Sequence, residues 1–308
     1  MKKALGYIGL CLLAFISILL VTTFHSDIPI EELKEKYANE QSQFIDINGL
    51  EVHYRIEGQG PDLVLIHGTA ASLHTWDAWT EILKDHFRII RFDLPAFGLT
   101  GPSAERDYSI QAYSDFVHDF TEALELDTFS IAGNSLGGGI AWAFAAEHPE
   151  KVEKLVLIDA TGIPDDKGDP PVFKMARNPI LGTLFEFFTP KSFIKKNMKE
   201  VYFDDSKVDE ELVTRYHEMA LREGNRIAFR DRAHVVNPDR TADLAKIRAY
   251  TLIIWGEDDQ WIPVSSAYVF QEKIQEAELA IMEEMGHVPM EEDPETSAAI
   301  AQEFLLNY

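Results

Sequence analysis

Short apolar runs alternate with amphipathic stretches along most of the chain. The first two runs, in QFIDINGLEVHYRIEG, meet at Asn48 and Gly49, a dipeptide that favours a tight hairpin turn. The later apolar runs lie in DLVLIHG, FRIIRFD, TFSIAG, VEKLVLIDA, AYTLIIWG and AELAIME. Between them the pattern predicts helices near 76–84 and 110–124, from 136, near 264–275, and from 294 to the C-terminus. Short apolar strands that alternate with helices predict an α/β fold, in which helices cover both faces of a mostly parallel sheet.

The segment 162–240 interrupts this alternation. It contains several prolines, aromatic clusters such as LFEFF, and helical stretches of mixed charge. Prolines spaced in this way limit the length of any regular element. We therefore predict a cap at 162–240, inserted into a core domain that is made of 43–161 and 241–308.

The N-terminus differs from the rest of the chain in hydropathy. Lys2 and Lys3 precede an uncharged, apolar stretch at 4–24. At about 1.5 Å per residue, a helix of this length just crosses a bilayer core of about 30 Å. The stretch predicts a transmembrane anchor at 1–24, with a cleaved signal segment as the alternative, and 25–42 is expected to be a spacer.

The charges that flank this stretch predict a localisation. The two lysines precede it, and an acidic segment, SDIPIEELKEKY, follows it. Because positive residues stay on the cytoplasmic side, we expect a membrane partner and a catalytic domain outside the cytoplasm. Cleavage would instead give a secreted or periplasmic protein.

Composition excludes some classes of partner. The 308 residues include 52 acidic and 28 basic side chains, which give a formal charge of −24 at pH 7. Such a charge repels a phosphate backbone, so no nucleic-acid partner is expected. Cys11 is the only cysteine in the sequence, so a disulfide within the chain is excluded.

Candidate chemistry begins with a serine at a sharp bend. The sequence Gly133-Asn134-Ser135-Leu136-Gly137 follows an apolar run and precedes a predicted helix. It matches the G-x-S-x-G pattern, in which the flanking glycines allow strand and helix to crowd a strained serine. A simple turn would use similar residues, so the prediction of Ser135 as a nucleophile depends on partners elsewhere in the chain.

A serine hydroxyl reacts only when a base takes its proton and an acid orients that base. His287 follows the last predicted strand in GHVPMEEDP, and Asp259 follows the preceding strand in WGEDDQWIP. The chain order Ser, Asp, His is the one expected of elbow-type hydrolases. We predict Ser135, Asp259 and His287 as a catalytic triad, and Asp159, at the end of LVLID, is an alternative acid.

Attack on a carbonyl places negative charge on its oxygen, which two backbone N–H groups could stabilise. The candidates for this oxyanion hole are the N–H of Thr69, in LIHGTAAS, and the N–H of Leu136. The sequence has no H-E-x-x-H pattern, no cluster of thiolates and no phosphate-binding loop with its lysine. No metal and no cofactor are therefore expected.

Five motifs appear in a familiar order along residues 43–308: LIHGTAAS, RFDLPAFGLTGP, GNSLGGG, WGEDDQWIP and GHVPMEEDP. Together they resemble the α/β-hydrolase superfamily, in particular its serine esterases and lipases. The resemblance implies an α/β-hydrolase fold with a mostly parallel eight-stranded sheet and a helical cap inserted after the sixth strand. It also implies Ser135, Asp259 and His287 as the triad.

The resemblance divides between two kinds of hydrolase. GNSLGG is similar to the carbon–carbon bond hydrolases, in which a tryptophan commonly follows the catalytic histidine, but here Val288 has that place. Arg177, Arg215 or Arg222 could correspond to the carboxylate-binding arginine of those enzymes.

The expected function is a serine hydrolase that cleaves carboxylic esters through an acyl-enzyme intermediate. Its partner would be a small-molecule ester with an apolar acyl group. A carbon–carbon bond hydrolase of vinylogous diketones, and a receptor-like protein that only binds a ligand, are the alternatives.

Overall fold

The apolar runs form one eight-stranded sheet in the computed structural model, which describes residues 7, 24–165 and 167–307. The strand order is β1-β2-β4-β3-β5-β6-β7-β8. Strand β2 is antiparallel to β1 and to β4, and the other neighbouring pairs are parallel. The strands are β1 (Ser42–Ile47), β2 (Leu50–Gly58), β3 (Asp62–Ile66), β4 (Arg88–Phe92), β5 (Phe129–Asn134), β6 (Val152–Ile158), β7 (Tyr250–Gly256) and β8 (Ala277–Met282).

Helices connect these strands and cover them. In the core they are α2 (Ile30–Tyr37), η1 (Leu73–Trp76), α3 (Asp77–Leu83), α4 (Ile110–Ala123), α5 (Leu136–Glu147), η3 (Thr241–Lys246), α11 (Ser265–Lys273), α12 (Pro289–Glu292) and α13 (Pro294–Asn307). Between β6 and β7 they are α6 (Pro171–Arg177), α7 (Pro179–Phe185), α8 (Lys191–Val201), η2 (Asp205–Lys207), α9 (Glu210–Leu221) and α10 (Asn225–His234).

The first two strands form the predicted hairpin. Ile47 pairs with Leu50, and the two residues between them, Asn48 and Gly49, have φ angles of 53° and 84°. Positive φ at both central positions is the conformation that Asn-Gly adopts readily and that matches the twist of a hairpin. The dipeptide therefore sets the antiparallel edge of the sheet.

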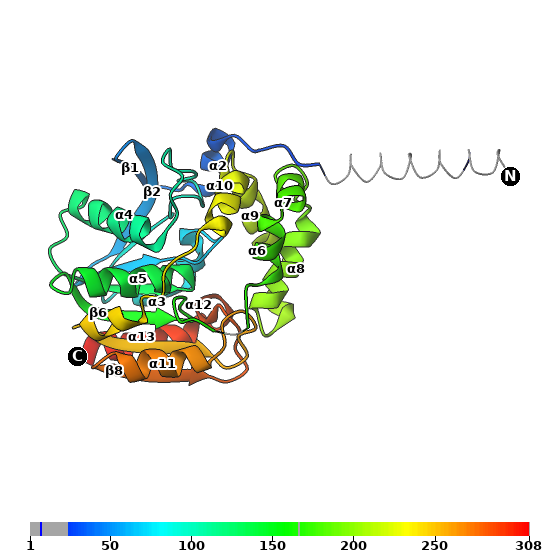
Figure 1. Ribbon diagram of the computed structural model, residues 1–308. Coiled ribbons are helices and arrows are strands. Elements are labelled where there is room, and N and C mark those ends of the chain that lie inside the picture. Colours follow the sequence, from blue (N-terminus) through cyan, green and yellow to red (C-terminus); the bar gives the residue numbers. More distant parts are fainter. Residues whose placement is uncertain (1–6, 8–23, 166, 308) are drawn as a thin grey trace.

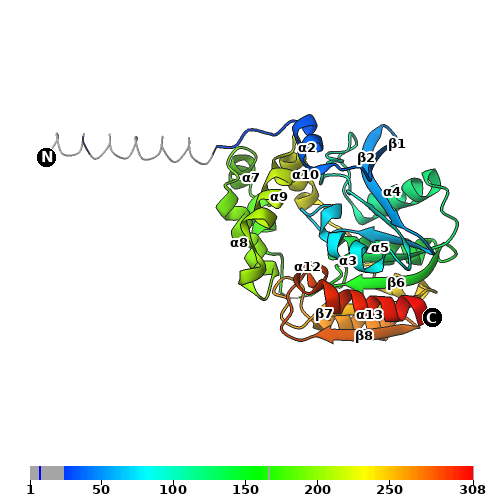
Figure 2. The same cartoon turned by 180° about the vertical axis from the view of Figure 1, so that it is seen from behind.

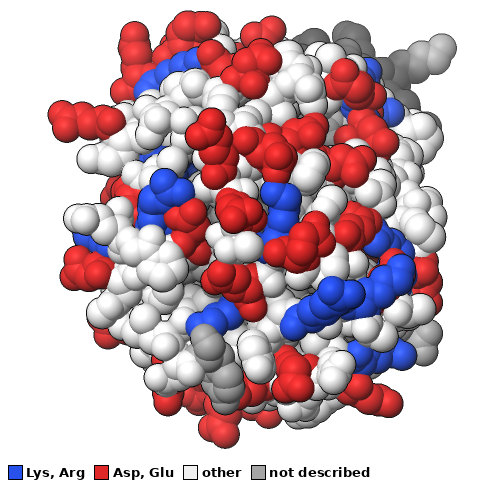
Figure 3. All heavy atoms as spheres, turned by 90° about the vertical axis from the view of Figure 1, so that its left-hand side faces the viewer, with Lys and Arg blue, Asp and Glu red and all other residues white. Residues whose placement is uncertain are grey.

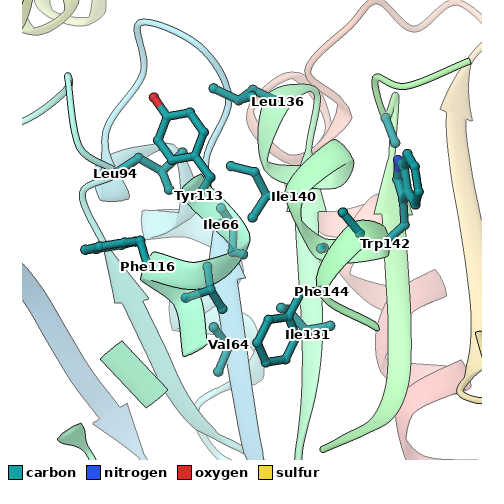
Figure 4. Packing of buried hydrophobic residues seen from close by; sticks show 14 of the residues in the cluster. Val64, Ile66, Leu94, Tyr113, Phe116, Ile131, Leu136, Ile140, Trp142 and Phe144 are labelled. Atoms are coloured by element: carbon teal, nitrogen blue, oxygen red, sulfur yellow. The ribbon is translucent and has the colours of Figure 1, made fainter. Parts of the chain in front are cut away.

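The parallel strands are buried on both faces because their alternate side chains enter two different cores. In β3, Val64 and Ile66 belong to one cluster, whereas Leu63 and Leu65 belong to the other. Helices α4, α5 and α11 cover the first face (Figure 1), and α3 and α13 cover the second (Figure 2). Figure 4 shows Val64, Ile66 and Ile131 of the sheet beside Phe116 of α4 and Phe144 of α5.

Helices α6–α10 form a group of their own beside the sheet (Figures 1 and 2). They follow β6, so the predicted fold class, an α/β-hydrolase fold with a helical cap after the sixth strand, is confirmed. The cap boundaries 162–240 remain a prediction. Helix α2, within the predicted spacer, packs Leu33 against Leu99 of the core and Met219 of α9.

The predicted N-terminal anchor, 1–24, lies outside the described residues apart from 7 and 24. In the described part of the chain, no helix has the length and apolarity that a membrane span requires. Its longest helices, α4 and α13, have 14 residues each, or about 21 Å against a hydrocarbon core of about 30 Å. The prediction of a membrane-anchored protein is withdrawn on this finding.

Candidate active site

Ser135 lies in a tight turn between β5 and α5. Its φ of 54° and ψ of −116° are strained for a residue with a Cβ. The neighbouring glycines make the turn possible: a Cβ on Gly133 would lie 2.2 Å from the carbonyl oxygen of Gly137, and one on Gly137 would lie 2.1 Å from that of Ile66. Only glycine allows the strand and the helix to approach so closely, as the sequence predicted.

His287 and Asp259 are joined by a hydrogen bond. The Nδ1 of His287 lies 2.6 Å from Oδ2 of Asp259, and both side chains are almost fully buried. The other oxygen of Asp259, Oδ1, accepts hydrogen bonds from the backbone N–H groups of Trp261 and Ile262, at 2.7 Å and 3.0 Å. These bonds fix the carboxylate, and a proton on Nδ1 leaves Nε2 of His287 free to accept one.

Asp159, the alternative acid, lies in the same buried group. A carboxylate oxygen of Asp159, a carboxylate oxygen of Asp259 and a ring nitrogen of His287 all lie within 4.8 Å of one another. Oδ1 of Asp159 accepts a hydrogen bond from the N–H of Gly256 at 3.0 Å, whereas its Oδ2 is buried and has no partner among the described residues. Burial and the nearby Asp259 carboxylate raise the pKa of Asp159 well above its usual range.

Two carboxyl groups and an imidazole could also ligate a metal ion. The Nδ1 of His287 is already bonded to Asp259, however, and the Nε2 is the atom that a base would use. The hydrogen bond between His287 and Asp259 therefore favours an acid–base group over a metal site. The expectation of no metal and no cofactor remains a prediction.

Ser135 and His287 both line two adjoining spaces. The first, called here the apolar cavity, has a volume of about 120 Å³, and the second, called the polar cleft, has a volume of about 440 Å³. In the described part of the chain, no hydrogen bond joins the Ser135 hydroxyl to His287. Such contacts are often long in a free enzyme and shorten when substrate binds.

The two candidate oxyanion donors are placed differently. Thr69 lines both the apolar cavity and the polar cleft. Leu136 begins α5, so its backbone N–H is one of those without an acceptor inside the helix. Its side chain points into the core (Figure 4).

Sequence reasoning missed the role of Asn134, which occupies the variable position before Ser135 in the G-x-S-x-G pattern. Its Nδ2 donates to the carbonyl oxygen of His287 at 2.9 Å and to that of Ile158 at 3.3 Å. The residue before the candidate nucleophile therefore holds the loop of the candidate base. Partners 153 positions apart leave no signal in a single sequence.

His67 organises the loop after β3. Its Nδ1 donates to the carbonyl oxygen of Gly68 at 2.7 Å, and its Nε2 accepts from the N–H of Leu94 at 2.9 Å. Burial lowers the pKa of His67, so it stays neutral in this tautomer. These bonds connect the loop that carries Thr69 to the end of β4.

Known proteins with the same architecture include hydrolases of different kinds. The 2-hydroxy-6-oxo-2,4-heptadienoate hydrolase of Pseudomonas putida is 27% identical over 249 residues, which are 78% of this chain and 87% of that protein. A crystal structure described as a membrane phospholipase A, a novel bacterial virulence factor, is 28% identical with a TM-score of 0.74, and the match covers 99% of this chain and 98% of that one. A putative lipase from Acinetobacter baumannii AYE is 26% identical with a TM-score of 0.76, over 92% and 97%.

Residues 61–294 match the family model of the alpha/beta hydrolase fold. The chain therefore belongs to the alpha/beta hydrolase family, as its motifs predicted, and it is a hydrolase. The relatives act on different bonds, so the bond that this chain cleaves has to be argued from its own site.

Proposed function

We propose that this protein is a serine hydrolase that cleaves carboxylic esters, with Ser135 as nucleophile, His287 as base and Asp259 as the acid that orients the base. One observation carries the proposal. Ser135 and His287 lie where an apolar cavity meets a polar cleft, so an ester bond placed between them has room for unlike groups on its two sides.

The reaction follows from the positions of the proton donors and acceptors. The Ser135 hydroxyl oxygen attacks the ester carbonyl while Nε2 of His287 takes its proton, and Asp259 stabilises the imidazolium. The N–H groups of Thr69 and Leu136 stabilise the oxyanion. The tetrahedral intermediate collapses, and the alcohol leaves with the proton from His287. Water then attacks the acyl-enzyme in the same way and releases the acid.

The linings of the two spaces support an apolar acyl group. The apolar cavity is bounded largely by cap side chains, among them Phe185, Phe193, Met198 and Phe229. An acyl chain gains free energy there because it leaves water. The polar cleft, which includes Asp165, Asp169 and Arg177, suits the alcohol portion. The lipase and phospholipase among the similar structures agree with this assignment.

Carbon–carbon bond cleavage is the second candidate, because the Pseudomonas putida relative hydrolyses a dienoate. The sequence suggested three arginines that could bind the carboxylate of such a substrate, but their contacts give this reaction little support. Arg215 lies 4.0 Å from Asp77, and Arg222 donates to the carbonyl oxygen of Thr100. Arg177 lines the polar cleft but is paired with Asp169. A receptor that only binds a ligand is the third alternative.

The test compares Ser135→Ala with the parent protein on p-nitrophenyl esters and on a vinylogous diketone. We expect the variant to lose at least about a thousandfold in kcat on esters, because its nucleophile is gone. Ser130→Ala changes a buried serine of β5, the strand that precedes Ser135; it is the matched control and should keep the parent rate. A fluorophosphonate probe should label the parent at Ser135.

Three results would contradict the proposal. An alanine variant that turns over esters at the parent rate would remove Ser135 from the mechanism. Faster cleavage of the diketone than of any ester would favour the carbon–carbon reaction. A parent protein that binds the ester but is not labelled by the fluorophosphonate probe would favour a receptor.

A further inference from the structure

One arginine that lines the polar cleft, Arg232, has no hydrogen-bond or ion-pair partner among the described residues. Arg232 lies in α10 and lines the cleft together with Ser135 and His287. Its Nε is buried without a hydrogen-bond partner. Among the described residues, nothing else forms a hydrogen bond or an ion pair with its guanidinium. A cation without a described partner therefore lines the same cleft as the candidate nucleophile and base.

The other arginines of 162–240 differ from Arg232 in this respect. Arg177 pairs with Asp169, Arg226 with Asp27, Arg230 with Glu186 and Arg240 with Glu147, while Arg215 faces Asp77 and Arg222 donates to backbone carbonyl groups. The chain has 52 acidic residues against 28 basic ones. Asp and Glu side chains are spread over the face of the molecule that Figure 3 shows. An unpaired arginine is therefore not explained by a shortage of carboxylates.

The described acids that line the polar cleft form their hydrogen bonds and ion pairs with other groups, although the charge of Asp169 also favours the charged form of Arg232. Asp169 is held by Arg177, which also lowers the pKa of Asp169. Asp165 accepts a hydrogen bond from the backbone N–H of Lys167 at 2.7 Å. Burial lowers the pKa of Arg232, but a guanidinium keeps its charge in proteins. A partly desolvated cation that lacks a partner is costly unless an anion joins it.

We infer that Arg232 binds an anionic oxyacid group, a carboxylate or a phosphate, in the alcohol portion of the ester. This inference rests on the proposed function, which it extends to a substrate class. Arg232 lines the polar cleft and not the apolar cavity, so the anion belongs on the leaving-group side. The planar guanidinium offers paired donors that match two oxygens of either group. The substrate is then an anionic amphiphile with an apolar acyl chain.

The experiment uses three esters with one acyl chain: the hexanoyl esters of glycerol, of glycerate and of glycerol 3-phosphate. We expect Arg232→Gln to lower kcat/KM by about 10- to 100-fold for an anionic ester, the usual effect of a lost charged hydrogen bond. Hydrolysis of the neutral glycerol ester should stay within about twofold. Arg248→Gln, an exposed arginine outside the cleft, makes the same change in net charge and should affect no ester.

The pattern across the three esters decides the outcome. If Arg232→Gln loses kcat/KM only on the glycerate ester, the site binds a carboxylate. If it loses kcat/KM only on the glycerol 3-phosphate ester, the site binds a phosphate. Equal loss on all three would show that Arg232 only supports the cap, and no loss on either anionic ester would show that it binds no substrate. Either result overturns the inference.

A binding measurement separates this inference from the proposed function. Titration calorimetry of Ser135→Ala, with and without Arg232→Gln, measures the affinity for the same three esters without turnover. A loss of affinity restricted to the anionic esters supports the site even if the parent protein hydrolyses none of them. Unchanged affinity overturns it even if the parent protein is an efficient esterase.

Discussion

At the scale of single residues, Asp159 and Asp259 differ in the hydrogen bonds that they accept. Asp259 accepts three hydrogen bonds, from the Nδ1–H of His287 and from two backbone N–H groups. Asp159 accepts one, from the backbone N–H of Gly256. Burial and the nearby Asp259 carboxylate raise the pKa of Asp159, so Asp159 is the carboxyl group that holds a proton. This asymmetry favours Asp259 over Asp159 as the partner of His287.

The raised pKa of Asp159 predicts a pH-dependent stability. An unfolded aspartate ionises near pH 3.9, so above that pH the native state holds a proton that the unfolded state has lost. The contribution of Asp159 to the free energy of unfolding is complete below the unfolded pKa and is lost as pH rises through the folded pKa. Asp159→Asn does not titrate. The free energy of unfolding of the variant, measured in urea, should therefore exceed that of the parent by more at pH 8 than at pH 4.5.

The control for this prediction is Asp85→Asn, an exposed aspartate. Its difference from the parent should change little over the same pH range. A difference between Asp159→Asn and the parent that is the same at both pH values would mean that Asp159 ionises alike in the two states. The charge assignment above would then be wrong.

At the scale of elements, the junction of β5 and α5 depends on backbone contact. A Cβ on Gly137 would lie 2.1 Å from the carbonyl oxygen of Ile66 in the neighbouring β3, and backbone cannot rotate away as a side chain does. We expect Gly137→Ala to lower the free energy of unfolding by about 3 kcal/mol, at the upper end of overpacking costs. Denaturant unfolding measures this.

Gly49→Ala is the comparison, because its added Cβ meets nothing within 4 Å and only its φ of 84° is unfavourable. It should cost about 1 kcal/mol. If the two variants unfold at the same denaturant concentration, β3 and α5 do not restrict position 137 as the structure indicates.

Local chemistry explains how much of the fold could be read from the sequence. The hairpin at Asn48 and Gly49, the alternation that buries β3 on both faces, and the glycines around Ser135 each depend on neighbours in the chain. Such features follow from periodicity and from backbone conformation. The positions of Asp259 and His287 after their strands followed from the same pattern.

The remaining features depend on partners that are distant in sequence. The sequence around Arg232 does not show that Arg232 has no carboxylate partner among the described residues, because this depends on how Arg177 and Asp169 pair in the folded cap. Asn134 finds the carbonyl oxygen of His287 only after β5 and β8 take their places in the sheet. The sequence pattern predicts the helices and strands, whereas the contacts of Arg232 and Asn134 depend on how those helices and strands pack.

At the scale of the whole molecule, the cap and the candidate base share one set of hydrogen bonds. The N–H of His287 donates to the carbonyl oxygen of Val201, the last residue of α8, at 2.7 Å. The buried carboxylate of Glu292 accepts from the N–H groups of Phe203 and Asp204, after α8, and from that of Gly286, at 3.1, 2.7 and 2.9 Å. These hydrogen bonds join the end of α8 to the loop of His287, so a shift of the cap should also shift the imidazole.

This link predicts that Glu292→Gln affects both stability and catalysis without touching substrate. The amide retains one oxygen and turns an NH2 group toward backbone donors, so charged hydrogen bonds worth about 1.5–3 kcal/mol each are weakened. We expect a lower free energy of unfolding and a lower kcat on esters, with KM changed less because the lining of the apolar cavity is intact. Glu295→Gln, an exposed residue at the start of α13, should leave all three quantities unchanged. A Glu292→Gln protein that loses stability but keeps the parent kcat would separate the two roles, and it would show that the cap can shift on α8 without moving His287.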